Sequence, residues 1–224
     1  MPSLTRALDR LRRLLGSSQD VAATDGGIAT VLDGASALAV VEGCLSEAAG
    51  LGAGARHTTH AWRGVEGRER ANVFAAPLEG IEARSARGAL ASAVGLGLTG
   101  VRATAFVSGP ELGRASDLLD RAAGGHLPLV VHLLCGDSGG SNVAGASGGG
   151  HAAYHTAADA GCGLLFAADV QEAIDLTLIA RRAAERALIP VVVAIDGDAT
   201  ARGLQDVRVP SPEMIRSYVG APDD

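Results

Sequence analysis

The stretch from Ala168 to Gly197, ADVQEAIDLTLIARRAAERALIPVVVAIDG, decides the fold class of this chain. Asp169 stands at an N-cap position and Glu172 follows three residues later, which is the spacing of a capping box at a helix start. Pro190 marks the end of that helix, and the apolar run from Val191 to Ile195 is typical of a strand buried on both faces. Strands of this kind occur in parallel sheets that lie between helices, so the stretch predicts an α/β fold.

The helix in this stretch has one broad apolar face. Its apolar positions recur at helical period, at Val170, Ala173, Ile174, Leu176, Thr177, Leu178 and Ala180. The other face carries charged side chains, and we expect four of them to face water: Arg181, Arg182, Glu185 and Arg186.

The rest of the chain alternates between helical and strand patterns. Predicted helices span residues 34–49, 82–98, 111–123 and 151–160, and predicted strands span residues 72–76, 101–107, 129–134 and 163–167. Such alternation implies right-handed crossovers and a doubly wound, mostly parallel sheet with helices on both faces. We expect a single α/β domain over residues 28–224, preceded by a short amphipathic helix and a linker over residues 1–27.

Composition excludes several classes of protein. The chain has 224 residues, 47% of them hydrophobic, and a formal net charge of −6 without a long basic run, which argues against a nucleic-acid surface. No apolar run reaches the ~18 residues of a membrane span. Three cysteines, Cys44, Cys135 and Cys162, lack CxxC spacing, so we expect buried free thiols and a cytoplasmic location.

Residues 170–197 resemble the end of the first domain of the 2-oxoacid:ferredoxin oxidoreductases, where a VQEA-type helix leads into a strand ending in Asp-Gly. Similar segments lie at fitting spacing over residues 33–50, 83–109, 127–132 and 207–220, so the resemblance covers roughly residues 30–220. It implies the thiamine diphosphate-binding fold, in a domain that holds the aminopyrimidine half of the cofactor. A partner domain holds the diphosphate, so we expect this chain to associate with itself or with a diphosphate-binding subunit.

Three functional positions of that family differ in this chain. The family carries a glutamate that hydrogen-bonds the pyrimidine and promotes its reactive tautomer; here the segment reads Ser85-Ala86-Arg87-Gly88, which puts Ala86 at the carboxylate position. The Tyr-Pro-Ile-Thr-Pro-Ser-Ser loop is absent, and the arginine that holds the substrate carboxylate falls at or near Gly136. We expect Glu82 to lie one helical turn before Ala86, where it could substitute for the glutamate.

Two hypotheses of function follow. In the first, the domain is degenerate and acts as a scaffold or interaction subunit of a larger assembly. In the second, it is the active pyrimidine-side subunit of a thiamine diphosphate-dependent 2-oxoacid oxidoreductase whose diphosphate-binding and iron–sulfur parts are on other chains. The remaining candidate residues are His132 and His151 for catalysis, and Ser108 and Gly109 for cofactor binding.

Several motif matches lead to no assignment. Gly95 to Gly100 fits GxGxxG, but it ends a predicted helix instead of beginning one, so it cannot hold a pyrophosphate. Gly136 to Gly140 fits the GxSxG elbow, yet a glycine-rich loop follows it where a helix is required, and that loop is either a flexible connection or an anion-binding segment. The pairs His151/His155 and His57/His60, the second in an expected irregular loop, lack further ligands nearby in the sequence, and we predict no metal site.

Overall fold

A computed structural model describes residues 27–136 and 151–222. The expected amphipathic helix over residues 3–15, nearly all of the linker and most of the glycine-rich loop lie outside the described residues. Within the described ranges, no helix has the length and apolar character needed to cross a membrane.

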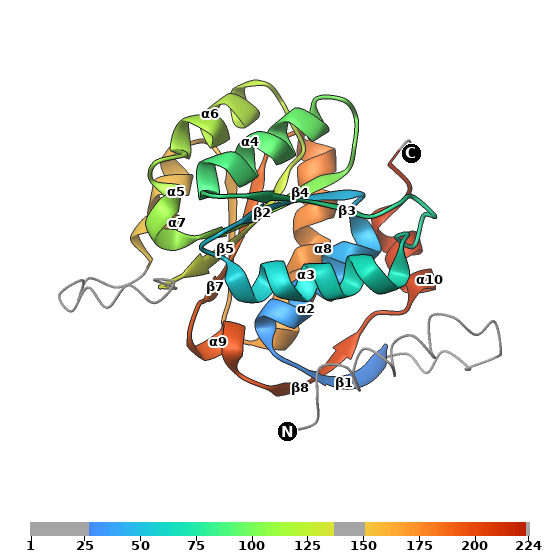
Figure 1. The fold of residues 1–224 in the computed structure, drawn as a ribbon. Helices are drawn as coiled ribbons and strands as arrows, with labels where there is room; N and C mark the ends of the chain where they lie inside the picture. The colour runs from blue at the N-terminus through green and yellow to red at the C-terminus, as the bar shows by residue number, and fades with distance from the viewer. Residues whose placement is uncertain (1–26, 137–150, 223–224) are drawn as a thin grey trace.

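The described residues form alternating strands and helices (Figure 1). In chain order they are β1 (Ile28–Leu32), α2 (Gly34–Leu45), β2 (Ala48–Gly52), α3 (Arg56–Glu69), β3 (Glu79–Ala83), α4 (Ala86–Gly97), β4 (Ala103–Ser108), α5 (Gly109–Leu112), α6 (Ser116–Gly124), β5 (Val130–Cys135), α7 (Ala152–Asp159), β6 (Gly163–Ala167), α8 (Val170–Ala187), β7 (Val191–Asp196), α9 (Ala199–Arg202), β8 (Gln205–Val209) and α10 (Pro212–Val219).

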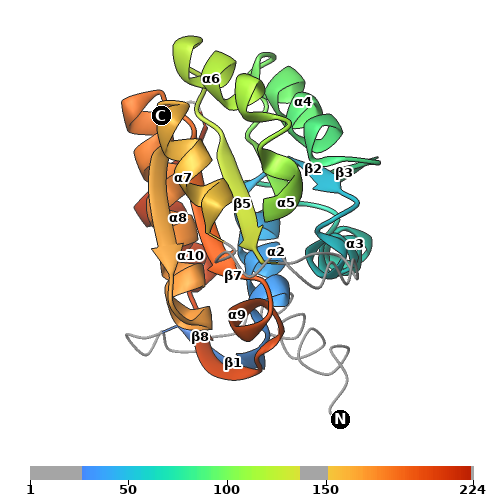
Figure 2. The ribbon, with the colours of Figure 1, turned by 90° about the vertical axis from the view of Figure 1, so that its left-hand side faces the viewer.

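Six strands form one parallel sheet in the order β3-β2-β4-β5-β7-β6. The remaining two, β1 and β8, pair antiparallel in a separate small sheet next to α9 (Figures 1 and 2). Helices cover both faces of the large sheet: α4, α5, α6 and α7 lie on one side, and α2, α3, α8 and α10 on the other (Figure 1). The predicted doubly wound α/β fold is confirmed.

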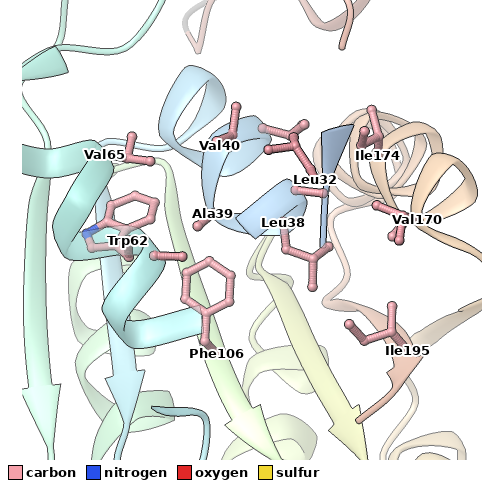
Figure 3. Close-up of a cluster of buried hydrophobic side chains, with 14 of the residues drawn as sticks. Leu32, Leu38, Ala39, Val40, Trp62, Val65, Phe106, Val170, Ile174 and Ile195 are labelled. Carbon is pink, nitrogen blue, oxygen red and sulfur yellow. The ribbon is translucent and has the colours of Figure 1, made fainter. Parts of the chain in front are cut away.

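The central strands alternate between the two helical layers. In β4, Phe106 packs with the α2–α3–α8 layer, whereas its neighbours Ala105 and Val107 pack with the α4–α6 layer. Because side chains in a strand point to opposite faces in turn, an unbroken apolar run is what a sheet covered on both sides requires. Figure 3 shows the first layer, in which Trp62 and Phe106 meet α2 residues and Ile195 lies toward α8.

The decisive stretch folds as predicted. Asp169 caps α8, and its Oδ1 accepts a hydrogen bond from the Glu172 backbone N–H at 2.8 Å. The Glu172 carboxylate reaches back to accept one from the Ala168 N–H, also at 2.8 Å. The expectation that Arg181 faces water is wrong, because this side chain is fully buried between α8, α2 and the sheet. A polar network described below holds it there.

One central strand was not predicted from the sequence. Residues 48–52, expected partly as the end of a helix, form β2, which is buried along its whole length between β3 and β4. The sequence AAGLG has no β-branched residue to indicate a strand. Its glycine has a packing reason: a Cβ on Gly50 would lie 2.0 Å from the backbone oxygen of Ala89, because α4 sits directly on this strand.

Three further expectations were wrong. Residues 50–70, where no helix or strand was predicted, contain α3, whose buried residues recur at helical spacing, at Thr58, Ala61, Trp62 and Val65. Residues 72–76 form a turn instead of a strand, because the Asn72 Oδ1 accepts hydrogen bonds from the N–H groups of Phe74 and Ala76. The helix expected over residues 82–98 begins only at Ala86, and residues 79–83 are the edge strand β3.

Candidate functional site

All six parallel strands end at one edge of the sheet, here called the carboxyl edge. Its strand ends are Gly52, Ala83, Ser108, Cys135, Ala167 and Asp196. Ligands of open α/β sheets bind in crevices outside this edge, because the loops and helix N-termini that follow the strands meet there. The family-derived candidates near Ala86, Ser108 and Gly136 all follow strands of this set, so the fold brings them to the same edge.

Ala86 is the first residue of α4 and is fully buried. Ser85 is the N-cap, and its hydroxyl accepts a hydrogen bond from the Gly88 N–H at 3.2 Å. The first backbone N–H groups of a helix have no partner within the helix. At Ala86 this donor is satisfied from outside: its N–H donates to Oε2 of Glu111 at 2.9 Å.

Glu111 was not among the sequence candidates. It lies on the one-turn helix α5 directly after β4, twenty-five residues beyond the helix start to which it bonds. No sequence pattern links the two positions, since only the pairing of β2 between β3 and β4 brings their carboxyl ends together. The one available indication is that an acidic residue follows a buried strand within three residues, at the edge where ligands bind.

The prediction that Glu82 lies on the same helix as Ala86 is wrong. Glu82 is part of the edge strand β3, and its side chain is 62% exposed. Its Oε1 accepts a hydrogen bond from Nε of Arg63 on α3, at 3.0 Å. The carboxylate is therefore turned toward α3 and already paired.

Ser108 and Gly109 lie where β4 passes into α5. The Ser108 side chain is almost fully buried, and its hydroxyl makes no hydrogen bond among the described residues. Gly54 borders the same place, because a Cβ built on it would lie 2.1 Å from the Ser108 Oγ and 3.4 Å from the Glu111 carboxyl carbon. Gly109 approaches the end of β5, with the Leu134 carbonyl oxygen 3.3 Å from its would-be Cβ. The Ser108 hydroxyl and the Glu111 carboxylate thus both lie beside Gly54, and Gly109 follows Ser108 directly.

His132 occupies a different environment, in the middle of β5. Its ring is fully buried and stacks on Phe106, with 5.1 Å between ring centroids. Its Nε2 lies 2.8 Å from Oε1 of Glu42 on α2. His132 thus belongs to a cluster inside the core instead of to the carboxyl edge.

That cluster, here called the buried network, consists of Glu42, Ser46, His132 and Arg181. The Glu42 Oε2 accepts hydrogen bonds from the Ser46 hydroxyl at 2.5 Å and from Nη2 of Arg181 at 3.3 Å. The same guanidinium donates to the Ala103 carbonyl at 3.0 Å. Burial by itself raises the pKa of the Glu42 carboxyl, but the Arg181 charge and the hydrogen bonds from His132 and Ser46 outweigh burial and lower the pKa from 4.5 to about 2.

The other histidine candidates lie on the surface. His151 is exposed at the start of α7, with its ring 4.9 Å from that of Phe166. His57 and His60 are exposed on α3, which corrects the expectation of an irregular loop. Among residues 27–136 and 151–222, no three His, Cys, Asp or Glu side chains gather in a way that could hold a metal ion.

The position assigned to the family's arginine is a glycine and so carries no side chain. Gly136 follows β5 directly, is exposed, and has a φ of 78°, in the left-handed region that favours glycine. The strand end before it is Cys135, whose thiol is buried. No guanidinium from this strand end therefore reaches the edge.

The thiols are poorly suited to nucleophilic chemistry. Burial raises the pKa of Cys135 and of Cys162 to about 11, with further contributions from Asp196 and Asp120 respectively. Burial and nearby carboxylates raise the pKa of Cys44 to about 12. A thiol reacts as its thiolate, so none of the three is activated. Cys44 borders a cavity of about 370 Å³ between α2, α3 and α10, away from the carboxyl edge.

Comparisons with known proteins identify the family. Residues 68–223 match the family model described as pyruvate flavodoxin/ferredoxin oxidoreductase, thiamine diphosphate-binding. The chain is 27% identical over 142 residues to the NADH-dependent phenylglyoxylate dehydrogenase subunit alpha of Aromatoleum evansii, covering 62% of this chain and 33% of that protein. It is 31% identical over 150 residues to pyruvate:ferredoxin oxidoreductase of Moorella thermoacetica, covering 67% of this chain and 13% of that protein.

A solved structure shares the fold. It is 2-oxoglutarate:ferredoxin oxidoreductase from Magnetococcus marinus, with 2-oxoglutarate, coenzyme A and succinyl-CoA bound; the TM-score is 0.64 at 21% identity, over 83% of this chain and 32% of that chain. The chain thus spans a third or less of the length of these proteins. Since the family model covers more than half of its residues, this chain belongs to the thiamine diphosphate-binding domain family of the pyruvate flavodoxin/ferredoxin oxidoreductases.

Proposed function

We propose that this chain supplies the aminopyrimidine side of a thiamine diphosphate site that a diphosphate-binding partner subunit completes. The observation that carries the proposal is the pair of polar groups at the carboxyl edge, the Ser108 hydroxyl and the Glu111 carboxylate, beside the start of α4. Ser108 is a cofactor-binding candidate from the family resemblance, and Glu111 bonds the backbone at Ala86, the position that the resemblance assigns to the family's glutamate. Both side chains are chemically able to bond an amino-substituted ring.

The residues present fit one half of the cofactor. A carboxylate accepts hydrogen bonds and a hydroxyl donates or accepts them, which suits the ring nitrogens and the exocyclic amine of an aminopyrimidine. The sequence contains no Gly-Asp-Gly segment with a downstream asparagine that would hold the diphosphate and its metal ion. A diphosphate-binding partner subunit supplies that half.

When bound, thiamine diphosphate supplies the carbon nucleophile and electron sink for cleaving the bond next to a 2-oxoacid carbonyl. This chain's part is to bind and orient the pyrimidine. Gly136, at the end of β5, has no side chain for a substrate carboxylate, which supports a substrate-carboxylate contact that comes from elsewhere in the assembly.

A second candidate function is favoured by the same two departures, Ala86 and Gly136. In that case the domain is a degenerate scaffold subunit that has lost both functional side chains and serves to hold an assembly together. The two functions differ in whether the assembly binds the cofactor at all.

The test is calorimetric titration of thiamine diphosphate with Mg²⁺, first into this chain alone and then into the complex recovered with a tagged chain from its native host. Saturable binding in the complex supports the half-site function. A complex that forms through this chain but takes up no cofactor contradicts it and leaves the scaffold function.

A further inference from the structure

A carboxylate lies close to Ala86, the position that the family resemblance assigns to a glutamate. Oε2 of Glu111 lies 2.9 Å from the Ala86 backbone nitrogen, so this acid sits at the N-terminus of α4 although it belongs to α5. The same helix start carries the family's glutamate. A side chain from a neighbouring strand end thus brings a carboxylate back to the place from which the substituted side chain would have projected.

The Glu111 carboxylate can accept further hydrogen bonds besides the one from Ala86. In the described part of the chain the carboxylate has this one hydrogen bond, and no cation pairs with it. The basic side chain next to Ala86, Arg87, is committed elsewhere: it donates two hydrogen bonds to the Asp117 carboxylate, at 2.5 and 2.9 Å. Glu111 is half-buried, and its second oxygen remains available as an acceptor.

The surroundings favour a ligand over a purely structural cap. Ser108 is 2% exposed, and no hydrogen bond joins its hydroxyl to another described residue. Its Oγ borders the same point beside Gly54 and is not fully enclosed, so it can bond a group that reaches this edge from outside. A ligand edge with one donor and one acceptor would satisfy both side chains.

We infer that Glu111 supplies the carboxylate that accepts a hydrogen bond from a protonated ring nitrogen of the bound aminopyrimidine, in place of a glutamate at position 86. The inference rests on the proposed function, because it requires that the assembly bind thiamine diphosphate. Glu111 then holds the pyrimidine by its charge, while its other oxygen keeps the start of α4 in position. The rival acid, Glu82, is turned away toward Arg63.

The experiment compares three variants in the complex recovered from the native host. E111Q removes the charge but keeps a side-chain oxygen that can still accept from the Ala86 N–H. E82Q is the matched control, because Glu82 is an acidic side chain near the same edge, on the edge strand β3 that precedes α4. The double variant A86E/E111Q restores a carboxylate to the family position without placing two carboxylates together.

Two measurements follow on each complex: calorimetric affinity for thiamine diphosphate with Mg²⁺, and the rate at which the proton on C2 of the bound thiazolium exchanges with deuterium, followed by NMR. We expect E111Q to slow the exchange by about 10²- to 10⁴-fold, the usual effect of losing a positioned acid or base, while E82Q stays at the wild-type rate. The double variant A86E/E111Q should exchange the C2 proton at least tenfold faster than E111Q.

Wild-type exchange in E111Q, with cofactor bound, would overturn the assignment of Glu111 and leave the proposed function standing. An equal loss in E82Q would also overturn it, because the effect would then not be specific to Glu111. Absence of cofactor binding in the wild-type complex would overturn the proposed function itself, and the role of Glu111 with it.

Discussion

Glu42 and Glu111 show how differently one domain treats two carboxylates. Glu42 lies in the core with three side-chain partners, and the Arg181 charge and hydrogen bonds hold its pKa at about 2. Glu111 lies at the carboxyl edge with a backbone N–H as its partner and no cation beside it in the described residues. A carboxylate that is fully enclosed by partners locks helices together, whereas one with a remaining acceptor site at the carboxyl edge is available for binding.

The largest expected loss of stability comes from removing Arg181 from the buried network. R181M removes the cation and leaves the Glu42 carboxylate buried beside His132, which should lower the free energy of unfolding by about 3–5 kcal/mol. R186M, on an exposed position of the same helix, is the control and should change it by less than about 0.5 kcal/mol. Urea unfolding midpoints measure both. Equal losses of stability in R181M and R186M would mean that the buried network does not stabilise the fold by the expected amount.

The pH dependence of stability tests the other half of that network. The pKa of Glu42 in the folded chain lies below its value of 4.5 in an unfolded chain, so its contribution is present above about pH 4.5 and is lost as the pH falls toward 2. The loss should amount to roughly 2–4 kcal/mol.

Urea midpoints between about pH 3 and pH 7 measure this loss, with E42Q as the comparison. E42Q is less stable at neutral pH, because Arg181 loses its partner, but its stability should vary less with pH over this window. Parallel pH curves for the two proteins would contradict the low pKa of Glu42.

The next largest change in stability tests the close packing at the carboxyl edge. G54A would place a methyl group against Ser108 and should destabilise the fold by about 1–3 kcal/mol. G64A adds the same methyl group inside α3 with nothing within 4 Å, and should instead stabilise by about 0.5–1 kcal/mol. Thermal unfolding of the two variants gives opposite shifts if the edge is packed as described, and shifts of the same sign if it is not.

The smallest expected change in stability concerns Glu111. E111A removes the acceptor at the start of α4 and should cost about 1 kcal/mol, as the loss of a helix cap does. E111Q keeps an acceptor and should stay within about 0.5 kcal/mol of the wild type. Chemical denaturation measures both variants. If E111Q unfolds as easily as E111A, a side-chain oxygen at position 111 does not stabilise the start of α4, which contradicts the role of the hydrogen bond to the Ala86 N–H.

Much of the fold could be predicted because its pattern is local. The cap at Asp169, the helical period of α8 and the apolar run of β7 each lie within a few residues of one another, so the sequence alone predicted them. β2 could not be predicted in the same way, since its Ala and Gly residues are buried by neighbouring strands and by α4 instead of by their own pattern.

The α/β class and the family resemblance followed from the amino-acid sequence alone. The burial of Arg181 became evident only in the folded chain, because its partner Glu42 lies 139 positions away on another helix. The same holds for Glu111, which meets Ala86 because parallel strands bring distant loops to one edge. Periodicity reports which face of an element is apolar, but a long-range ion pair or cap depends on how the elements are stacked.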